Sequence, residues 1–188
     1  GAVQLRQFGA EIFMIDGLAF GIPREIAVLI TAIVVAGRSG SAFTAQIGTM
    51  QVNQEVDALK VVGLDPIEVL VLPRINALLI TLPMLVFLAD VAGLMGGGLM
   101  AVLALDLTVG QFMNRLEDVI SLQHFLVGLV KAPVFAYIIA IVGCFEGLRV
   151  TGSAESVGKM TTKSVVESIV LVILADALFS ILFSALGI

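Results

Sequence analysis

Long apolar runs alternate with short polar segments along this chain. Three of the runs contain a single charged residue each: 75–105 with Asp90, 125–145 with Lys131, and 168–188 with Asp176. A helix needs about 20 mostly apolar residues to cross a bilayer, and each run is long enough. Since the runs are continuously apolar and lack the alternation of a membrane β-strand, membrane-spanning helices are predicted.

The pattern predicts an all-α integral membrane protein, a polytopic helical bundle in which residues 1–188 form one transmembrane domain. Spans are expected at 23–47, 75–105, 125–148 and 168–188. Gly21-Ile22-Pro23 marks the start of the first span, because proline is tolerated in a first helical turn. The mixed segment 1–22 is expected at the membrane interface or on the outer side, and the polar segments 106–124 and 149–167 are expected as loops.

The composition supports this class. Hydrophobic residues make up 59% of the chain and charged residues only 13%, and the mean hydropathy is +1.12. Soluble domains are far less apolar. The net charge of −5 says little about partners, because the charges are confined to a few segments, and no nucleic-acid partner is expected. Cys144 is the only cysteine, so an intrachain disulfide is impossible and no metal site is suggested.

Lysine and arginine are unevenly distributed among the polar segments, and this predicts the orientation. The segments 38–74 and 149–167 each contain three basic residues, whereas 106–124 contains only Arg115 beside three acidic residues. The positive-inside rule places the two basic segments in the cytoplasm and the acidic one outside. One span in each gap between the segments satisfies this arrangement.

The polar stretch 36–66 interrupts the apolar pattern, and its Gly37–Ser41 run could cradle a phosphate or form a contact surface. The Walker pattern G-x-x-x-x-G-K-[ST] is absent from the chain, and no strand is predicted before Gly37, so nucleotide binding is disfavoured. Small residues in this stretch would also permit close packing of helices. They are Gly37, Gly40, Ser41, Ala42 and Ala45.

A short amphipathic helix is predicted at 55–64. Val56, Leu59 and Val62 recur at helical spacing. Charged residues lie between them, and Asp65-Pro66 is expected to stop the helix. An amphipathic helix on the cytoplasmic side is suited to docking into a groove on a soluble partner.

The run 36–74, AGRSGSAFTAQIGTMQVNQEVDALKVVGLDPIEVLVLPR, closely resembles the signature region of the MlaE-type permeases, the membrane subunits of lipid-transporting ABC systems. The resemblance continues through GLMGGGLM at 93–100 and TTKSVVES at 161–168, so it covers essentially the whole chain. In that family an upstream membrane helix precedes the region where this chain begins. Because the chain also starts at Gly1 rather than methionine, it is expected to be a fragment lacking that helix.

The resemblance implies a homodimeric, multi-pass permease of the bacterial inner membrane, bound to two cytoplasmic ATPases and to a periplasmic partner with an MCE domain. The implied cargo is phospholipid or a related lipid, which connects the chain with lipid asymmetry of the outer membrane. ATP and Mg would bind to the partner ATPase, so no cofactor, metal or catalytic residue is assigned to this chain. The coupling residues implied within 55–64 are Glu55, Val56, Leu59, Lys60, Val62 and Gly63.

Charged residues inside the predicted spans lie at similar estimated depths. With a helical rise of about 1.5 Å per residue, they fall into one layer in the outer half of a hydrocarbon core about 30 Å thick. The layer contains Arg24, Glu25, Asp90, Lys131 and Asp176. A lone charge is costly there, so Lys131 and Asp176 are expected to be electrostatic partners, directly or through Arg24 and Glu25.

Two interpretations of this layer stay open: a structural network of ion pairs, or a set of groups that surrounds a cavity and holds a lipid headgroup. Ile26 and Ile30 lie on one stripe of the first span and are expected to line such a cavity, although core packing explains them equally well. The alternative function is an ion-coupled secondary transporter that uses Asp90 and Asp176. That class typically shows an inverted repeat, which is not visible in the sequence.

Overall fold

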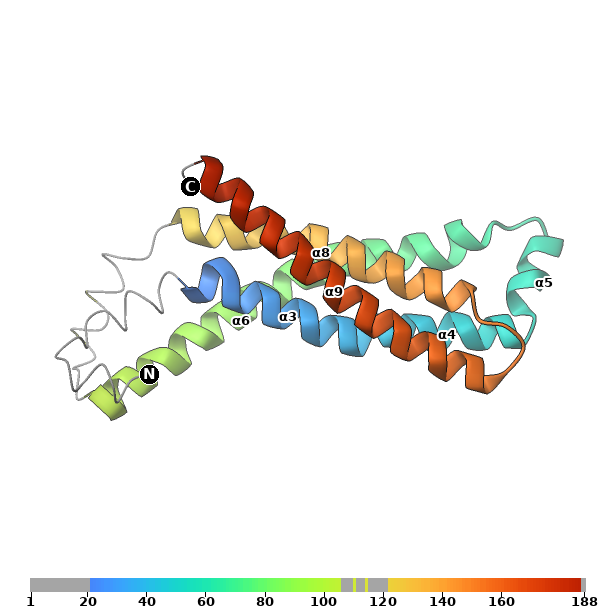
Figure 1. Ribbon diagram of the computed structural model, residues 1–188, viewed down its shortest axis with the longest axis horizontal. Helices are drawn as coiled ribbons and strands as arrows, with labels where there is room; N and C mark the ends of the chain where they lie inside the picture. Colours follow the sequence, from blue (N-terminus) through green and yellow to red (C-terminus); the bar gives the residue numbers. More distant parts are fainter. Residues whose placement is uncertain (1–20, 106–109, 111–113, 115–121, 187–188) are drawn as a thin grey trace. The chain divides into compact units, whose positions relative to one another are not determined.

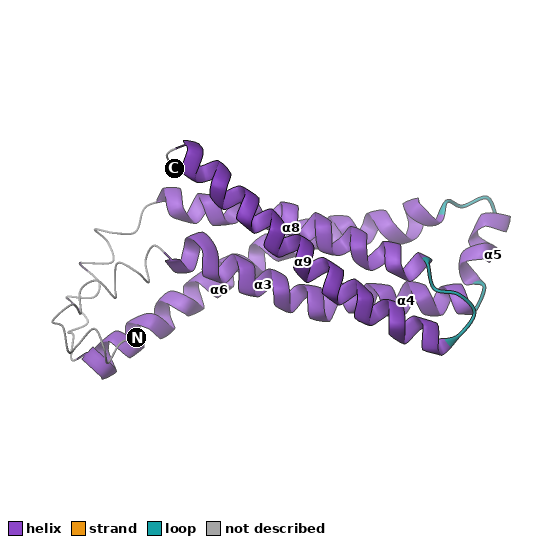
Figure 2. Cartoon of the chain, in the orientation of Figure 1, coloured by secondary structure: helices purple, strands orange, loops and turns teal. Residues whose placement is uncertain are grey.

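The computed structural model describes residues 21–105, 110, 114 and 122–186. The predictions for the segment 1–20 and for most of the 106–124 loop lie outside the described residues. Within the described ranges the chain is helical, and no strand is formed (Figures 1 and 2). Among the described residues, four helices are long and apolar enough to cross a membrane: Arg24–Val52, Ile67–Leu103, Leu126–Leu148 and Ala154–Leu186. The prediction of an all-α, polytopic membrane protein is confirmed.

The first membrane helix is continuous over four segments. They are η1 (Ile22–Ile26), α3 (Ala27–Val35), η2 (Ala36–Gly40) and α4 (Ser41–Val52), where η1 and η2 are short π-helical turns. Pro23 lies in the first turn, as predicted. The glycine-rich run at 37–41 is therefore part of a helix, which passes the expected boundary at residue 47. It continues because its buried face, which includes Thr44 and Ile47, packs in the core.

The predicted short helix is present as α5 (Glu55–Val61). Its regular part ends before the expected residue 64, because Gly63 has a φ of 86°, a left-handed conformation that stops a helix. The second membrane helix follows as η3 (Ile67–Val71) and α6 (Leu72–Leu105). Asp65 assists its start, since its carboxylate accepts a hydrogen bond of 2.9 Å from the backbone N–H of Ile67.

The last two helices are α8 (Leu122–Leu148) and α9 (Ala154–Leu186). The predicted loop at 149–167 is wrong for most of its length, because α9 begins at Ala154. Its polar first half stays helical, since Lys163 and Glu167 form an ion pair of 3.3 Å at i,i+4 spacing and Ser164 faces the core. Hydropathy therefore locates the start of the apolar run at residue 168, whereas the helix itself begins earlier, at Ala154.

The chain divides into two compact units, 1–28 with 85–130 and 29–84 with 131–188. In the second unit, α8 meets the first membrane helix through small residues. A Cβ on Gly143 would lie 2.9 Å from the carbonyl oxygen of Gly40, and one on Gly147 would lie 2.8 Å from Ile47 Cβ. Thr44 Oγ1 also donates a hydrogen bond of 2.9 Å to the Gly143 carbonyl. Gly143 and Gly147 form a GxxxG pair that permits this approach.

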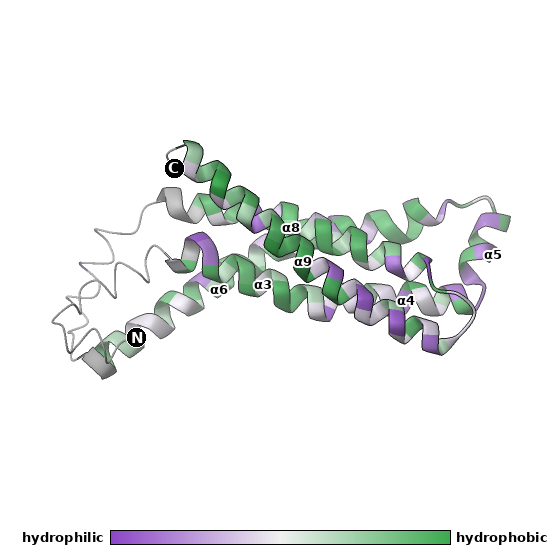
Figure 3. Ribbon diagram, in the orientation of Figure 1, coloured by the Kyte–Doolittle hydropathy of each residue, from purple (hydrophilic) through white to green (hydrophobic). Residues whose placement is uncertain are grey.

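The predicted role of the small residues in helix packing is confirmed at Gly40 but not at Gly37, which has open space beside it. In the first unit, Gly93 of α6 has a similar role, because a Cβ there would lie 2.8 Å from Ile22 Cγ2. Hydropathy along the helices agrees with the membrane assignment. Figure 3 shows apolar residues along the long helices, with hydrophilic residues gathered on α5 and on the first turns of α9.

Candidate functional site

A buried ion pair joins α8 and α9. Lys131 Nζ lies 2.9 Å from Asp176 Oδ1, a distance that also makes this contact a charge-assisted hydrogen bond. The Lys131 side chain is fully buried, and that of Asp176 is 15% exposed. An isolated charge at mid-membrane costs about 2.5–3.5 kcal/mol on insertion scales, so each residue offsets the cost of the other. The predicted direct partnership of the two residues is confirmed.

Aromatic residues reinforce the same pair of helices. Phe135 and Phe179 lie one turn from Lys131 and Asp176, and their rings meet edge to face with centroids 6.3 Å apart. Phe179 is in turn stacked on Phe183 at 5.8 Å. The Phe135–Phe179 contact restricts the separation of α8 and α9 near the ion pair. The charges are therefore held in an apolar setting where their interaction is strong.

The remaining charges of the predicted layer belong to the other unit. Arg24 Nε lies 3.8 Å from Glu25 Oε1, and both side chains are partly buried. Asp90 on α6 is only 3% exposed, and its Oδ1 accepts no hydrogen bond from the described residues. A buried carboxylate oxygen without a donor is energetically costly. The arrangement of all five charges in one layer stays a prediction.

The predicted cavity residues Ile26 and Ile30 point out of the core. Their exposed fractions are 50% and 56%. Core packing within this chain therefore does not explain them. An exposed apolar face of a membrane helix can contact lipid or another apolar surface, and this keeps their assignment to a lipid-binding wall as a prediction.

The coupling residues predicted in and after α5 separate into two groups. Val56 is 1% exposed, so it packs within the chain and is not available to a partner. This corrects the predicted stripe, because α5 turns one part of its apolar face toward its own core. Leu59 is half-buried, and Val62 is 76% exposed beside Val61 at 87%. The accessible apolar surface is therefore at the C-terminal end of α5.

The polar members of the predicted coupling set lie on the surface. Glu55 accepts a hydrogen bond of 3.2 Å from Asn53, and Lys60 pairs with Asp57 at 3.0 Å. Both are exposed, as is Gly63. Such exposed pairs contribute little to stability, so these side chains are free to change partners when another protein binds.

The sequence predicts an ordinary interfacial charge at Glu146, but the structure buries it, so this prediction is wrong. Its side chain is fully buried near the end of α8. There, Oε1 accepts hydrogen bonds from Lys163 Nζ at 3.0 Å and from Arg149 Nη1 at 3.3 Å. The other oxygen, Oε2, has no hydrogen-bond partner among the described residues. The sequence signal for this buried pair is an acidic residue at the end of one apolar run and a lysine in the polar segment that follows. The network connects α8 to the first half of α9.

The described residues form no group that could hold a metal ion: across 21–105 and 122–186, no three His, Cys, Asp or Glu side chains gather in one place. What the two units do provide is a set of long apolar helices with a few buried charges and one exposed helix, α5. Buried charges within apolar membrane helices commonly mark the path of a substrate or an ion.

Comparison with known proteins decides the family. The profile of the family described as permease MlaE matches residues 1–182. The chain belongs to the MlaE permease family. Its resemblance to that family, based on the 36–74 signature, is therefore confirmed.

Named relatives support the same assignment. A probable ABC transporter permease of Rickettsia felis is 37% identical over 177 residues, which cover 94% of this chain and 68% of the relative. A probable ABC transporter permease of Synechocystis is 38% identical over 181 residues, or 96% of this chain and 69% of the relative. The chain is similar to these proteins over most of its length and is an ABC transporter permease subunit.

A plant relative extends the comparison. The Arabidopsis thaliana protein trigalactosyldiacylglycerol 1, chloroplastic, is 37% identical over 166 residues, which cover 88% of this chain and 47% of the relative. The family membership also weighs against the ion-coupled transporter, because permeases of ABC systems imply an ATPase partner.

Proposed function

We propose that this MlaE-family permease moves phospholipid or a related lipid between the bacterial inner membrane and a periplasmic partner with an MCE domain. Family membership supports a permease, and the Arabidopsis relative carries the name of a galactolipid. The observation that carries the proposal is the buried Lys131–Asp176 pair between apolar helices. In this proposal the pair offers a cation and an anion to a lipid headgroup, and the apolar helices around it accept the acyl chains.

The chemistry of a lipid headgroup fits this pair. A phospholipid carries an anionic phosphate, which the ammonium group of Lys131 can bind in place of the Asp176 carboxylate. Because Lys131 is fully buried, its charge needs a partner at every stage, and an exchange between Asp176 and the phosphate would meet that need. Ile26 and Ile30 would provide apolar contacts for the acyl chains. Arg24, Glu25 and Asp90 belong to the other unit and are proposed as further lipid-binding residues.

Energy would come from a separate cytoplasmic ATPase that binds ATP and Mg, with no cofactor in this chain. α5 joins the first membrane helix to the second, so a force on α5 reaches both of them directly. Its exposed end, with Val61 and Val62, is suited to a groove on the ATPase. Two copies of the permease and two ATPases would form the transporter in the inner membrane, and transport would maintain lipid asymmetry of the outer membrane.

The test is transfer of a labelled phospholipid by the assembled complex in proteoliposomes, with and without ATP. ATP-dependent transfer to an MCE-domain acceptor should require both Lys131 and Asp176. Replacing the exposed Lys159 with glutamine is the matched control, because it removes a positive charge from the same region of sequence without affecting a buried pair. Transfer that needs no ATP, or an ion gradient in place of ATP, would contradict the proposal.

A further inference from the structure

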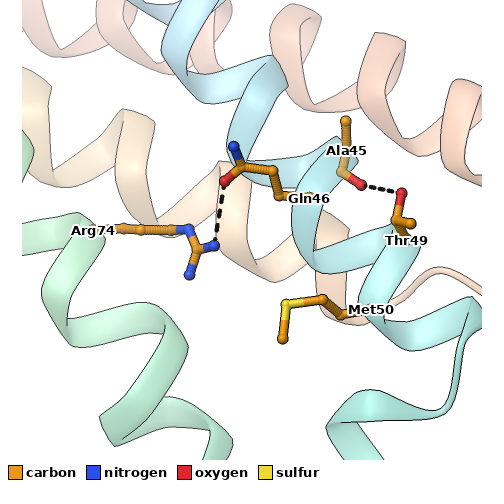
Figure 4. A pocket seen from close by; sticks show the side chains of 5 residues that line it. All are labelled: Ala45, Gln46, Thr49, Met50 and Arg74. Carbon is orange, nitrogen blue, oxygen red and sulfur yellow. Dashed lines mark hydrogen bonds between the residues drawn. The ribbon is translucent and has the colours of Figure 1, made fainter.

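A groove on the second unit contains an arginine that lacks a carboxylate partner. The groove is shallow and widely open, with a volume of about 500 Å³. Its lining comes from α4 and from the start of α6: Ala45, Gln46, Thr49, Met50 and Arg74 (Figure 4). Small-molecule sites have volumes of roughly 300–1,000 Å³, so the groove has room for a ligand group.

Arg74 is held in place by uncharged contacts. Its Nη1 donates a hydrogen bond of 2.6 Å to the Leu70 carbonyl, and its Nη2 donates one of 3.3 Å to Gln46 Oε1. The guanidinium also lies over the Phe43 ring, 5.8 Å from the centroid. Figure 4 shows the side chain reaching from α6 toward Gln46 and Met50. The other N–H groups of the guanidinium have no acceptor among the described residues.

Three cations in the described part of the second unit are not exposed, namely Arg74, Lys131 and Lys163, and of these only Arg74 has no carboxylate within 4.0 Å; the exposed Arg38 and Lys159 have none either. Lys60, Lys131, Arg149 and Lys163 each pair with an acidic residue. Arg74 is half-buried, and no acidic side chain of the described residues lies within 4.0 Å of it. A half-buried guanidinium beside apolar walls gains from an anion, which would supply the missing acceptor oxygens.

Two polar side chains of the groove, Arg74 and Gln46, keep N–H groups that can donate to a ligand. The Gln46 oxygen already accepts from Arg74, so its NH₂ group is left to donate. The Thr49 hydroxyl uses its one proton in a hydrogen bond of 2.8 Å to the Ala45 carbonyl, so it offers no donor to a ligand. Donors from two helices therefore face a space that Ala45 and Met50 make partly apolar. An anionic oxygen with an apolar tail matches both features.

We propose that this groove binds the phosphate of a phospholipid from the leaflet on the α5 side, with Arg74 and Gln46 as donors and Met50 against the first acyl carbons. From the positive-inside prediction, this is the cytoplasmic leaflet. Arg74 directly precedes the apolar run 75–105 and lies about two turns after the start of the second membrane helix at Ile67. The groove is a second lipid contact, remote in sequence from the Lys131–Asp176 pair. Its place in transport rests on the proposed function, whereas lipid binding does not.

The experiment places p-benzoylphenylalanine at position 50 of the assembled complex in nanodiscs of phosphatidylglycerol, phosphatidylcholine and diacylglycerol. Light-induced adducts are identified by mass spectrometry. Phospholipid should be captured in preference to diacylglycerol, and Arg74→Gln should reduce the capture about tenfold, as expected for losing one charge-assisted hydrogen bond. Arg74→Lys should keep part of it. The control places the same probe at Ile80, which is 66% exposed on α6. Capture there should not depend on the phosphate of the lipid or on the substitution of Arg74.

Three results would overturn the proposal. Capture at position 50 that is equal for phospholipid and diacylglycerol would mean that the phosphate is not recognised, and this comparison needs no Arg74 variant to fold. Loss of phospholipid capture on adding inorganic phosphate would assign the groove to a free anion. Adducts with the ATPase alone would make it a protein contact. Lipid transfer by the same complex, measured separately, distinguishes a failed groove from a failed transport function.

Discussion

Lys131 and Asp176 lie 45 residues apart in sequence, yet their side chains form a contact of 2.9 Å that joins α8 to α9. Lys131 is fully buried, so removing Asp176 leaves an uncompensated charge in an apolar environment. Asp176 is slightly exposed and can reach water more easily. The two residues therefore depend on each other unequally, and this asymmetry can be measured.

Asp176→Ala should destabilise the permease more than Lys131→Met. Breaking a buried pair by removing one partner costs about 3–5 kcal/mol, and the larger value is expected where the stranded ion is Lys131. The double variant should be less unstable than the sum of the single variants, by about 0.5–3 kcal/mol. Thermal unfolding in detergent and lipid transfer in proteoliposomes measure this. Strict additivity in both assays would show that the pair has no energetic coupling.

The Lys131–Asp176 contact was predictable because the depth of each residue follows from counting along a helix. A lone charge in an apolar run also demands a partner, and few were available at that depth. The four membrane helices and α5 were predictable for a related reason. Apolar runs of the right length and the Gly63–Pro66 break are local features of the sequence.

Other features depend on tertiary contacts that a linear pattern does not contain. Hydropathy cannot show that α9 begins at Ala154, because the helix is stabilised there by packing and by ion pairs rather than by the membrane. The burial of Val56 follows from how α5 returns toward α4. Glu146 looked like an interfacial charge, and only the approach of α9 brings Lys163 to it.

The exposed end of α5 predicts which substitutions weaken binding of the ATPase to the permease. Leu59→Asp and Val62→Asp should each weaken its co-purification at least about tenfold, since an unpaired charge in an apolar interface costs more than about 1.4 kcal/mol. Both variants should insert and unfold at the normal temperature. Val56→Asp is the contrasting variant: because Val56 is buried, it should lower the unfolding temperature. Normal ATPase binding by Val62→Asp would remove α5 from the coupling interface.

The Glu146 network predicts a difference between removing the anion and removing its cations. Arg149 and Lys163 are 53% and 39% exposed, so both can be hydrated once Glu146 is neutral. Glu146→Gln should therefore cost about 1.5–3 kcal/mol, the value of hydrogen bonds to a charged group. Replacing Arg149 and Lys163 together with methionine strands a buried carboxylate and should cost about 3–5 kcal/mol. Unfolding of the purified permease in denaturant compares the two. A larger loss for Glu146→Gln would mean that burial of the carboxylate has been misassigned.

The glycine contact between α8 and the first membrane helix gives a prediction with a matched control on α9. Gly143→Ala places a methyl group 2.9 Å from the Gly40 carbonyl oxygen, where the backbone cannot move aside easily, and should destabilise by about 1–3 kcal/mol. Gly158→Ala makes the same change in a helix with open space around it. Because alanine is the better helix former by about 1 kcal/mol, that variant should be neutral or more stable. Both are compared by thermal unfolding in the same detergent. Equal stability of the two variants would show that α8 and the first membrane helix are not in close contact at Gly40 and Gly143, and that the GxxxG pair does not determine their packing.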